Sequence, residues 1–342
     1  MAYSGMTTKV RALSGKLLSE ENFRELLEQP GVPEAVTFLK QFPEYADILK
    51  DTDENRLHRK DVELLLRSSI YRNYSKLYNF ASRKQRTFLK TYFMRYEVYF
   101  LKLCLTNILD PRDTFLDTHL FEDYFSSHSD LDLRSLVGSR TPAELTEHLK
   151  GTPYFHPMDL INRMENPTLF DYETALDLVY SKTLWDTRLK ISSAGEAEYL
   201  TKVLGTRFDL LNLQWICRAK HFYHMDDATI YAMLLPVKYK LPAAKIRELV
   251  ETTSPEALEH AVSTTYYAGR YKDLTSETIG ALYSQIMKKM LTAECRKDPY
   301  SVSSVYNYLY HKEHEVDRLT IALECIRYKL SAGDAIQRLQ AR

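Results

Sequence analysis

Three stretches of this chain repeat one helical pattern, an acid followed by hydrophobic residues, at intervals of about a third of its length. The acids are Glu97, Asp209 and Glu315, and a hydrophobic residue follows each of them by one, four and eight positions. This spacing places the apolar side chains on one face of an α-helix. The acids lie 112 (209−97) and 106 (315−209) residues apart in a chain of 342. Three related units are therefore expected.

A second repeated element supports the same period. It contains a proline and a glutamate, then an apolar helical stripe, and ends at a tyrosine; its copies are residues 31–45, 139–154 and 252–267. Pro33, Pro142 and Pro255 are 109 (142−33) and 113 (255−142) residues apart. Proline followed by glutamate is a helix-start signal, because the first N–H groups of a helix are unpaired and its amino end is positive.

The order of the two elements predicts how the units close. Pro142 follows Glu97 by 45 residues and Pro255 follows Asp209 by 46, but no such element follows Glu315. We expect the Pro33 element to take that place, so that the two ends of the chain share one lobe. The predicted fold is an all-α ring of three similar lobes. The predicted divisions are residues 1–55 (completing lobe three), 56–160 (lobe one), 161–270 (lobe two) and 271–342 (lobe three).

Long helices, joined as hairpins, are expected between these landmarks. The chain has only 10 Gly and 12 Pro, and no segment alternates with the period of a strand, so no sheet is predicted. Residues 62–90 predict one continuous helix, and residues 172–190 and 277–295 take the corresponding place in the other units. The acid-led segments are the expected return helices. The acids themselves are interpreted as residues near helix starts that favour the positive helix end.

Composition narrows the class of protein. The 46 basic residues are balanced by 46 acidic ones, so no overall charge attracts nucleic acid or anionic lipid. The first residues lack the apolar core of a signal peptide, and no apolar run of about 18 residues occurs. A cytosolic protein that does not span a membrane is predicted. The four cysteines form no CxxC pair, and free, buried thiols are expected.

The sequence gives no strong signal for a catalytic, cofactor or metal site. Residues 14–16, Ser-Gly-Lys, lack the earlier glycine and the following Ser or Thr of a phosphate-binding loop. Cys217, His221 and His224 share a helical spacing, and so do His311 and His314. Neither set has the residues of a known zinc motif, so helix packing is the favoured interpretation. No catalytic residue, cofactor, metal or small-molecule substrate is predicted.

One segment is strongly basic. Residues 56–102 contain twelve Lys or Arg against three acids, interleaved with Tyr and Phe. Such a pattern is typical of a solvated helix face, but it also suits a patch that docks an acidic protein or lipid headgroups, or a nucleic-acid-binding surface. Nucleic acid is the less favoured partner.

Three segments of the sequence resemble those of a known family. They are YSGMTTKVRAL from Tyr3 with Leu-Leu-Ser at 17–19, FDLLNLQWICRAK from Phe208, and KEHEVDRLTIALECIRYKL from Lys312. Together and in this order they resemble the C subunit of the central stalk of V/A-type rotary ATPases, whose eukaryotic relative is the d subunit. The resemblance covers essentially the whole chain, and the chain's length suggests a bacterial or archaeal origin.

The resemblance implies a non-catalytic subunit, shaped as a funnel of three helical lobes. It would couple the rotating shaft, made of D- and F-type subunits, to the membrane rotor ring during ATP-driven ion transport or ATP synthesis. Its place would be peripheral, on the cytoplasmic face of the membrane. Arg207, Arg218 and Arg327 are the candidate partner contacts, because arginine forms forked hydrogen bonds; Arg218 has no counterpart in the other copies. The alternatives are a helical scaffold of another cytosolic assembly and a nucleic-acid-binding protein that uses residues 56–102.

Overall fold

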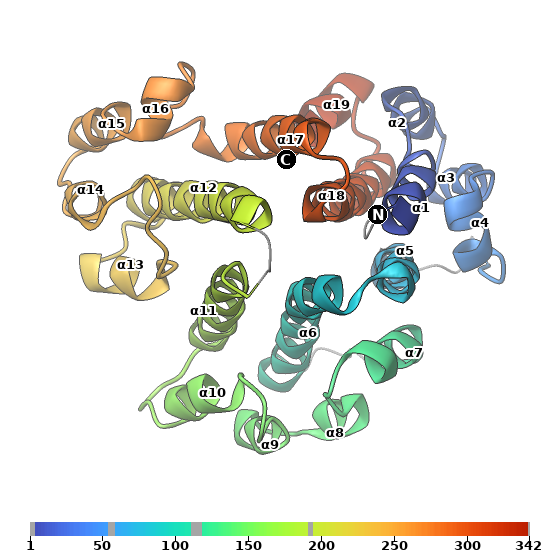
Figure 1. Cartoon of the computed structure of the whole chain (residues 1–342), viewed down its shortest axis with the longest axis horizontal. Coiled ribbons are helices and arrows are strands. Elements are labelled where there is room, and N and C mark those ends of the chain that lie inside the picture. The colour runs from blue at the N-terminus through green and yellow to red at the C-terminus, as the bar shows by residue number, and fades with distance from the viewer. Residues whose placement is uncertain (1–3, 54–58, 111–117, 191–193, 341–342) are drawn as a thin grey trace. The chain divides into compact units, whose positions relative to one another are not determined.

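The computed structural model describes residues 4–53, 59–110, 118–190 and 194–340, and in these ranges the regular structure is helical with no strand. The all-helical prediction is therefore confirmed. The chain forms two compact units: residues 1–82 with 280–342 make unit 1, and residues 83–279 make unit 2. Figure 1 labels the helices in chain order. The first and last parts of the chain thus belong to the same unit.

Unit 1 is built around one long helix. Its helices are α1 (Ser4–Ser14), α2 (Glu20–Leu27), α3 (Val32–Leu39), α4 (Pro43–Leu49), α5 (Arg59–Phe80), α17 (Ile279–Lys297), α18 (Val302–Arg327) and α19 (Ala332–Gln340). Helix α18 packs against α1, α2, α3, α5 and α19. The N-terminal helices therefore complete their core with the C-terminal part of the chain.

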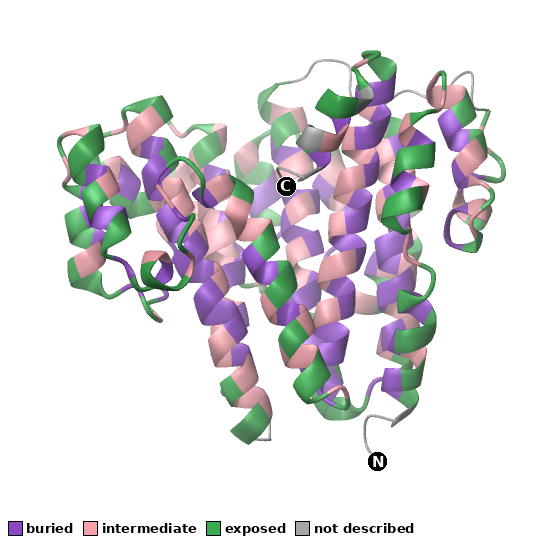
Figure 2. Ribbon diagram, turned by 90° about the horizontal axis from the view of Figure 1, so that it is seen from above, coloured by how far each residue is buried: buried purple, intermediate pink, exposed green. Residues whose placement is uncertain are grey.

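Unit 2 alternates long and short helices. They are α6 (Arg83–Leu109), α7 (His119–His128), α8 (Leu133–Gly138), α9 (Pro142–Glu147), α10 (Phe155–Asn162), α11 (Leu169–Thr187), α12 (Ala194–Arg218), the π-helix η1 (Ala219–Tyr223), α13 (Asp227–Met233), α14 (Ala243–Val250), α15 (Pro255–Ser263) and α16 (Tyr266–Arg270). Helix α6 packs along α11 and, more locally, α8. Buried residues are concentrated on the long helices, whereas the short helices carry more exposed surface (Figure 2).

The predicted helix starts agree with the structure at all three proline-led elements. Pro33, Pro142 and Pro255 lie in the first turn of α3, α9 and α15. The hydroxyls of Thr141 and Ser254 accept a hydrogen bond from a first-turn N–H group in α9 and α15. These caps satisfy donors that a short helix would otherwise leave unpaired.

Two predictions about the long helices are wrong. Residues 62–90 are not one helix, because α5 ends at Phe80 and α6 begins at Arg83. Asn79 and Ser82 flank this break, and both residue types favour turns and caps over helix interiors. The acid-led segments also begin earlier than expected, so that Glu97, Asp209 and Glu315 lie in the interior of α6, α12 and α18. The interaction with a helix start therefore does not explain the acids.

The hairpins differ from the expectation as well. Short turns do connect α5 to α6 and α17 to α18, but the most extensive helix packing lies elsewhere: α6 packs with α11, and α5 packs with α18. The two most extensive helix contacts therefore join helices that are distant in sequence.

Leu213 and Leu319 test the helix register. Both side chains are fully buried, Leu213 in unit 2 and Leu319 in unit 1. Changing either one to Ala should lower the free energy of unfolding by about 2 to 5 kcal/mol, because lost apolar burial is added to the cost of a cavity. Chemical denaturation would measure this loss. Leu160→Ala is the control, because Leu160 is 65% exposed, and an unchanged stability for both core variants would contradict the register.

Candidate functional site: three buried acids and a surface groove

The first repeated acid, Glu97, is bonded to two hydroxyl groups from later segments. Tyr154 OH donates to Glu97 Oε2 over 2.6 Å, and Ser129 Oγ donates to Oε1. Tyr154 directly precedes α10, and Ser129 directly follows α7. Glu97 thereby connects the middle of α6 to the chain on both sides of α8 and α9.

The second acid, Asp209, collects four donors. The backbone N–H groups of Tyr239, Lys240 and Leu241 lie 3.2, 2.5 and 3.0 Å from its carboxylate, and Tyr267 OH lies 2.8 Å away. The residue one turn earlier, Gly205, allows this approach, because an added Cβ there would lie 2.5 Å from Tyr239 Cγ. A fully buried carboxylate is stabilised by such a complete set of donors.

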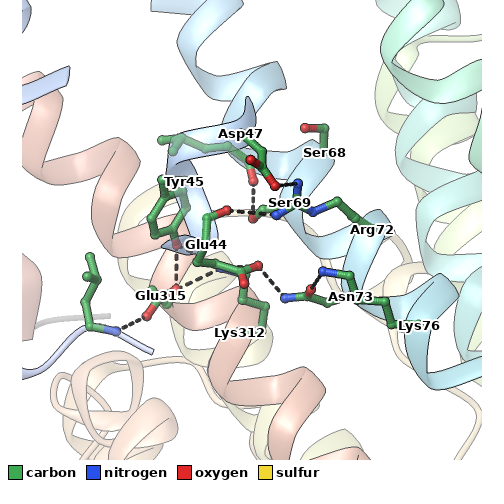
Figure 3. Close-up of polar contacts among 12 residues, drawn as sticks. Glu44, Tyr45, Asp47, Ser68, Ser69, Arg72, Asn73, Lys76, Lys312 and Glu315 are labelled. Atoms are coloured by element: carbon green, nitrogen blue, oxygen red, sulfur yellow. Dashed lines mark hydrogen bonds and ion pairs between the residues drawn. The ribbon is translucent and has the colours of Figure 1, made fainter. Parts of the chain in front are cut away.

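The third acid, Glu315, is bonded to the N-terminal part of unit 1. Tyr45 OH donates to Oε1 over 2.5 Å, and the Leu18 N–H donates to Oε2 over 2.5 Å. Figure 3 shows Tyr45 of α4 and Lys312 of α18 converging on this carboxylate. In each of the three places the phenol comes from the tyrosine that ends the proline-led element, Tyr154, Tyr267 or Tyr45.

Among the residues that the structure describes, only those of the third contact include a buried cation. Lys312 is fully buried, with Nζ 2.9 Å from Glu315 Oε1, 2.9 Å from Tyr45 OH and 3.6 Å from Glu44 Oε1. Asn73 Nδ2 of α5 donates to Glu44 Oε1 over 2.5 Å (Figure 3). It also donates to Tyr308 OH over 2.7 Å. This buried network joins α4, α5 and α18. The residues at the position of Lys312 in the other copies are Met94 and Thr206.

The residue three positions after each acid contacts a segment outside the long helix, and the type of interaction differs between the three copies. Phe100 packs against Phe121 and Phe125 of α7, with ring centroids 5.7 and 5.4 Å apart. Asn212 exchanges two hydrogen bonds, 3.0 and 2.8 Å long, with the backbone of Leu235. Arg318 binds both carboxylate oxygens of Glu20, at 2.8 and 2.7 Å, and covers the ring of Phe23. The unequal residues at this register therefore perform one task, which is to anchor a segment outside the long helix.

Burial shifts the titration of the acids and their phenols. Desolvation raises the pKa of Glu97 above its ordinary value, although hydrogen bonds from Ser129 and Tyr154 act in the opposite direction. Desolvation also raises the pKa of Asp209. Burial, and then the neighbouring carboxylate, raises the pKa of each partner phenol, Tyr45, Tyr154 and Tyr267. The phenols are therefore protonated donors at physiological pH.

Unit 2 carries a surface groove of about 620 Å³ between α11 and the end of α12. Its lining is mainly apolar and aromatic, with two acids on α11 and one arginine: Phe170, Glu173, Thr174, Asp177, Trp215, Arg218, Ala219, Tyr223, Met225 and Met233. Asp177 is paired with Lys102 over 2.7 Å. Apolar walls with a few polar groups are typical of binding surfaces.

The π-helix η1 shapes one end of this groove. It continues α12 and leaves Phe222 and Tyr223 exposed. It ends at His224, whose φ of 47° lies in the left-handed region, and the Met225 N–H closes the turn on the Ala219 carbonyl. Single π-turns are frequent at functional sites.

The structure does not gather the three candidate arginines in one place. Arg218 is exposed on the groove, and its side chain makes no hydrogen bond or ion pair with the described residues. Arg207 is half-buried and has partners within the chain. Arg327 is exposed and lies in unit 1, beside Val62 and Leu323. Among the three, only Arg218 combines exposure with a groove of this size.

The histidine and cysteine spacings do not produce a metal centre in the described ranges, where no group of three or more His, Cys, Asp or Glu side chains could hold an ion. His221 Nε2 lies 2.9 Å from Ser276 Oγ. Burial raises the pKa of the Cys217 thiol to about 12, so this cysteine is an unreactive packing residue. All four cysteines are free, and three of them are buried.

The basic segment 56–102 is divided between the two units, and residues 56–58 lie outside the described residues. Several of its cations have partners: Arg67 pairs with Glu63 and Asp317, and Arg72 with Asp47.

Within the part of the chain that the structure describes, no helix has the length and hydropathy needed to cross a bilayer.

Removing a partner phenol tests the acid contacts. Tyr45→Phe, Tyr154→Phe and Tyr267→Phe should each lower the free energy of unfolding by about 1 to 3 kcal/mol, because a buried carboxylate loses a donor. Urea titration of each variant would measure the loss. Tyr328→Phe is the matched control, since Tyr328 is 66% exposed; equal effects at all four positions would contradict this role.

The raised pKa of Glu97 predicts a pH dependence. Since the folded protein binds this proton more tightly than the unfolded chain, folding is favoured by protonation. The contribution of this proton to the free energy of unfolding is complete below pH 4.5, the ordinary pKa of a glutamate. It is lost as the pH rises through the higher pKa of Glu97 in the folded protein. Wild type should therefore gain stability relative to Glu97→Gln as the pH falls from neutral toward 4.5. Parallel stability curves for the two proteins would be evidence against the shift.

Comparisons with known proteins agree over nearly the whole chain. The family model described as ATP synthase (C/AC39) subunit matches residues 6–338. The chain is 24% identical to the C subunit of the A-type ATP synthase of Methanosphaera stadtmanae, over 93% of this chain and 82% of the relative. It is 25% identical to the C subunit of the A-type ATP synthase of Methanobrevibacter smithii, over 97% of this chain and 85% of the relative. It is 23% identical to the C subunit of the A-type ATP synthase of Thermococcus kodakarensis, over 95% of this chain and 86% of the relative.

The matched region contains α2 to α18 and all three buried acids with their phenols. Family membership thus covers both units. The chain belongs to the ATP synthase (C/AC39) subunit family, which comprises the V/A-type ATPase proteins that its sequence resembles.

Proposed function

We propose that this protein is the central-stalk subunit of a V/A-type ATPase, and that it couples the rotating shaft to the membrane rotor ring. The match of the family model to residues 6–338 is the observation that carries this proposal. In this role the chain transmits torque and does not catalyse a reaction. It is a peripheral component on the cytoplasmic face of the membrane.

We further propose that its helices form a funnel of three similar lobes. The three acid–tyrosine hydrogen bonds support this repeat, because each joins the interior of a long helix to the end of a proline-led element. The third contact supports the circular arrangement, since Tyr45 and Glu315 are 270 residues apart in sequence. Three stiff lobes would suit a part that has to carry torque without deforming.

Arg218 and the groove beside it are our proposed contact with the rotating shaft. A free guanidinium next to Trp215 and Tyr223 combines the residue types that dominate binding energy at protein interfaces. Glu173 on the opposite helix offers a negative charge to a basic group of the partner. A shaft helix with apolar side chains and both signs of charge fits this lining.

Complex formation tests the central-stalk role. The full-length protein, mixed with purified D- and F-type shaft subunits of its own organism, should elute with them in size-exclusion chromatography. A separate experiment would mix it with detergent-solubilised rotor ring. Separate elution from both partners would overturn the proposal and favour the second candidate, a helical scaffold of another assembly.

A single substitution tests the contribution of Arg218 to binding of the shaft subunits. Arg218→Ala should weaken binding of the shaft subunits about tenfold, equivalent to ~1.4 kcal/mol, because an interface arginine at an aromatic groove is typically a main contributor. Isothermal titration calorimetry would measure the dissociation constant. Arg140→Ala, an exposed arginine outside the groove, is the control; equal affinity of both variants would remove Arg218 from the interface.

A further inference from the structure

Unit 1 contains a polar cavity of about 190 Å³. Six of its lining residues are polar or charged, and all of them belong to unit 1: Glu20 of α2, Ser284, Gln285 and Lys288 of α17, and His314 and Arg318 of α18. Ser284 and Lys288 are four positions apart, and so are His314 and Arg318. Each pair therefore lies on one face of its helix.

The cavity contains hydrogen-bond donors for which the protein supplies no acceptor. Four of the six side chains form no hydrogen bond or ion pair within the described chain: Ser284, Gln285, Lys288 and His314. The carboxylate in the lining, that of Glu20, has both oxygens bound to Arg318, at 2.8 and 2.7 Å. A hydroxyl, an amide, an ammonium and an imidazole thus surround this space and can each donate to a ligand.

The charge around His314 is predominantly positive. Burial lowers the pKa of His314 to about 4, and the charges of Arg318 and Lys288 act in the same direction. His311 lowers this pKa further, whereas the carboxylate of Glu20 raises it. The ring of His314 is therefore uncharged at neutral pH and can donate one N–H. Lys288 and Arg318 together outweigh the single acid of the lining.

We propose that this cavity, which we call the anion pocket, binds a small oxyanion such as inorganic phosphate, held by Lys288, Gln285 and His314. Phosphate presents several acceptor oxygens around one centre, which suits donors that come from two helices. A metal cation is disfavoured, because two lining side chains are cations and the carboxylate is already bound.

The volume also favours a small ion, since pockets for drug-sized ligands measure about 300 to 1,000 Å³. A bound ion would contact side chains of both α17 and α18. The inference goes beyond the coupling role, because it concerns a soluble ion and requires neither shaft nor ring.

Isothermal titration calorimetry of the full-length protein with sodium phosphate, at an ionic strength fixed with sodium chloride, tests the proposal. Phosphate should bind at a single site. Lys288→Gln should weaken this binding at least about tenfold, because a charge-assisted hydrogen bond is lost. Gln285→Ala should weaken it by a smaller factor, without a change of charge.

Lys289→Gln is the matched control for Lys288→Gln. Lys289 is the next residue on α17, is exposed and does not line the cavity. Its substitution makes the same change of net charge, so this variant should bind phosphate as the wild type does. ATP serves as a second ligand, to distinguish the free ion from the phosphoryl groups of a nucleotide.

The imidazole of His314 provides a local readout. Sulfate is the probe here, because it takes up no proton in the range in which the ring titrates. Bound sulfate should raise the pKa of His314 above about 4, since a neighbouring negative charge favours the imidazolium. Proton NMR titrations with and without sulfate would measure the shift, and His314→Gln would identify the signal by its loss.

Several outcomes would overturn the proposal. They are absent phosphate binding, an equal loss of affinity in Lys288→Gln and Lys289→Gln, and binding of ATP by a protein that does not bind phosphate. An unchanged pKa of His314 in the presence of sulfate would do the same. None of these results depends on whether the protein joins the shaft and ring.

Discussion

A carboxylate in the middle of a buried helix has to receive hydrogen bonds from outside that helix, because the backbone N–H groups around it are already used. Helices α6, α12 and α18 each contain one such acid, and each obtains a phenolic O–H from a short segment distant in the chain. This requirement fixes where the short helices lie. Without these donors, the long helices would hold an unsatisfied charge in their cores.

The three acids are satisfied in different ways, and the differences distinguish the parts of the fold. Asp209 relies on backbone N–H groups that Gly205 allows to approach, whereas Glu97 relies on two hydroxyls. Glu315 is paired with the buried Lys312, and neither of the other acids has such a partner in the described ranges. A buried ion pair contributes little net stability, but loss of one partner is costly. The contact that joins the ends of the chain is therefore the one most sensitive to a single substitution.

Much of the architecture is predictable from the sequence, but its main interaction is not. Periodicity and proline signals predict the helices and the positions of α3, α9 and α15, because these depend on local chemistry. The same signals assign Glu97, Asp209 and Glu315 a wrong role, because the serines that directly precede Arg83, Ala194 and Val302 in the sequence are the residue type that marks a helix start, and they lie well before the acids. The recurring tyrosines are visible in the sequence, but only coordinates pair them with the acids. Lys312 and the π-helix have no distinguishing pattern.

The groove, too, is not predictable from the sequence. Arg218 is a candidate from the sequence because the other repeats lack it, but nothing in the sequence associates it with Phe170 or Met233. Phe170 lies on α11, Arg218 at the end of α12 and Met233 on α13, so the groove depends on packing between helices. The apolar lining is conspicuous only after the fold is known, since each member is unremarkable in its own helix.

The contact between Tyr45 and Glu315 has a consequence for biosynthesis. Residues of unit 2 are consecutive, so this unit can acquire its core while the ribosome is still translating the rest. The N-terminal helices are translated before unit 2, whereas α18 is translated after it. During that interval the faces of α1, α2 and α3 that pack on α18 lack this partner. Until α18 has been translated, unit 1 is thus the part of the nascent chain that is most exposed to chaperones and to aggregation.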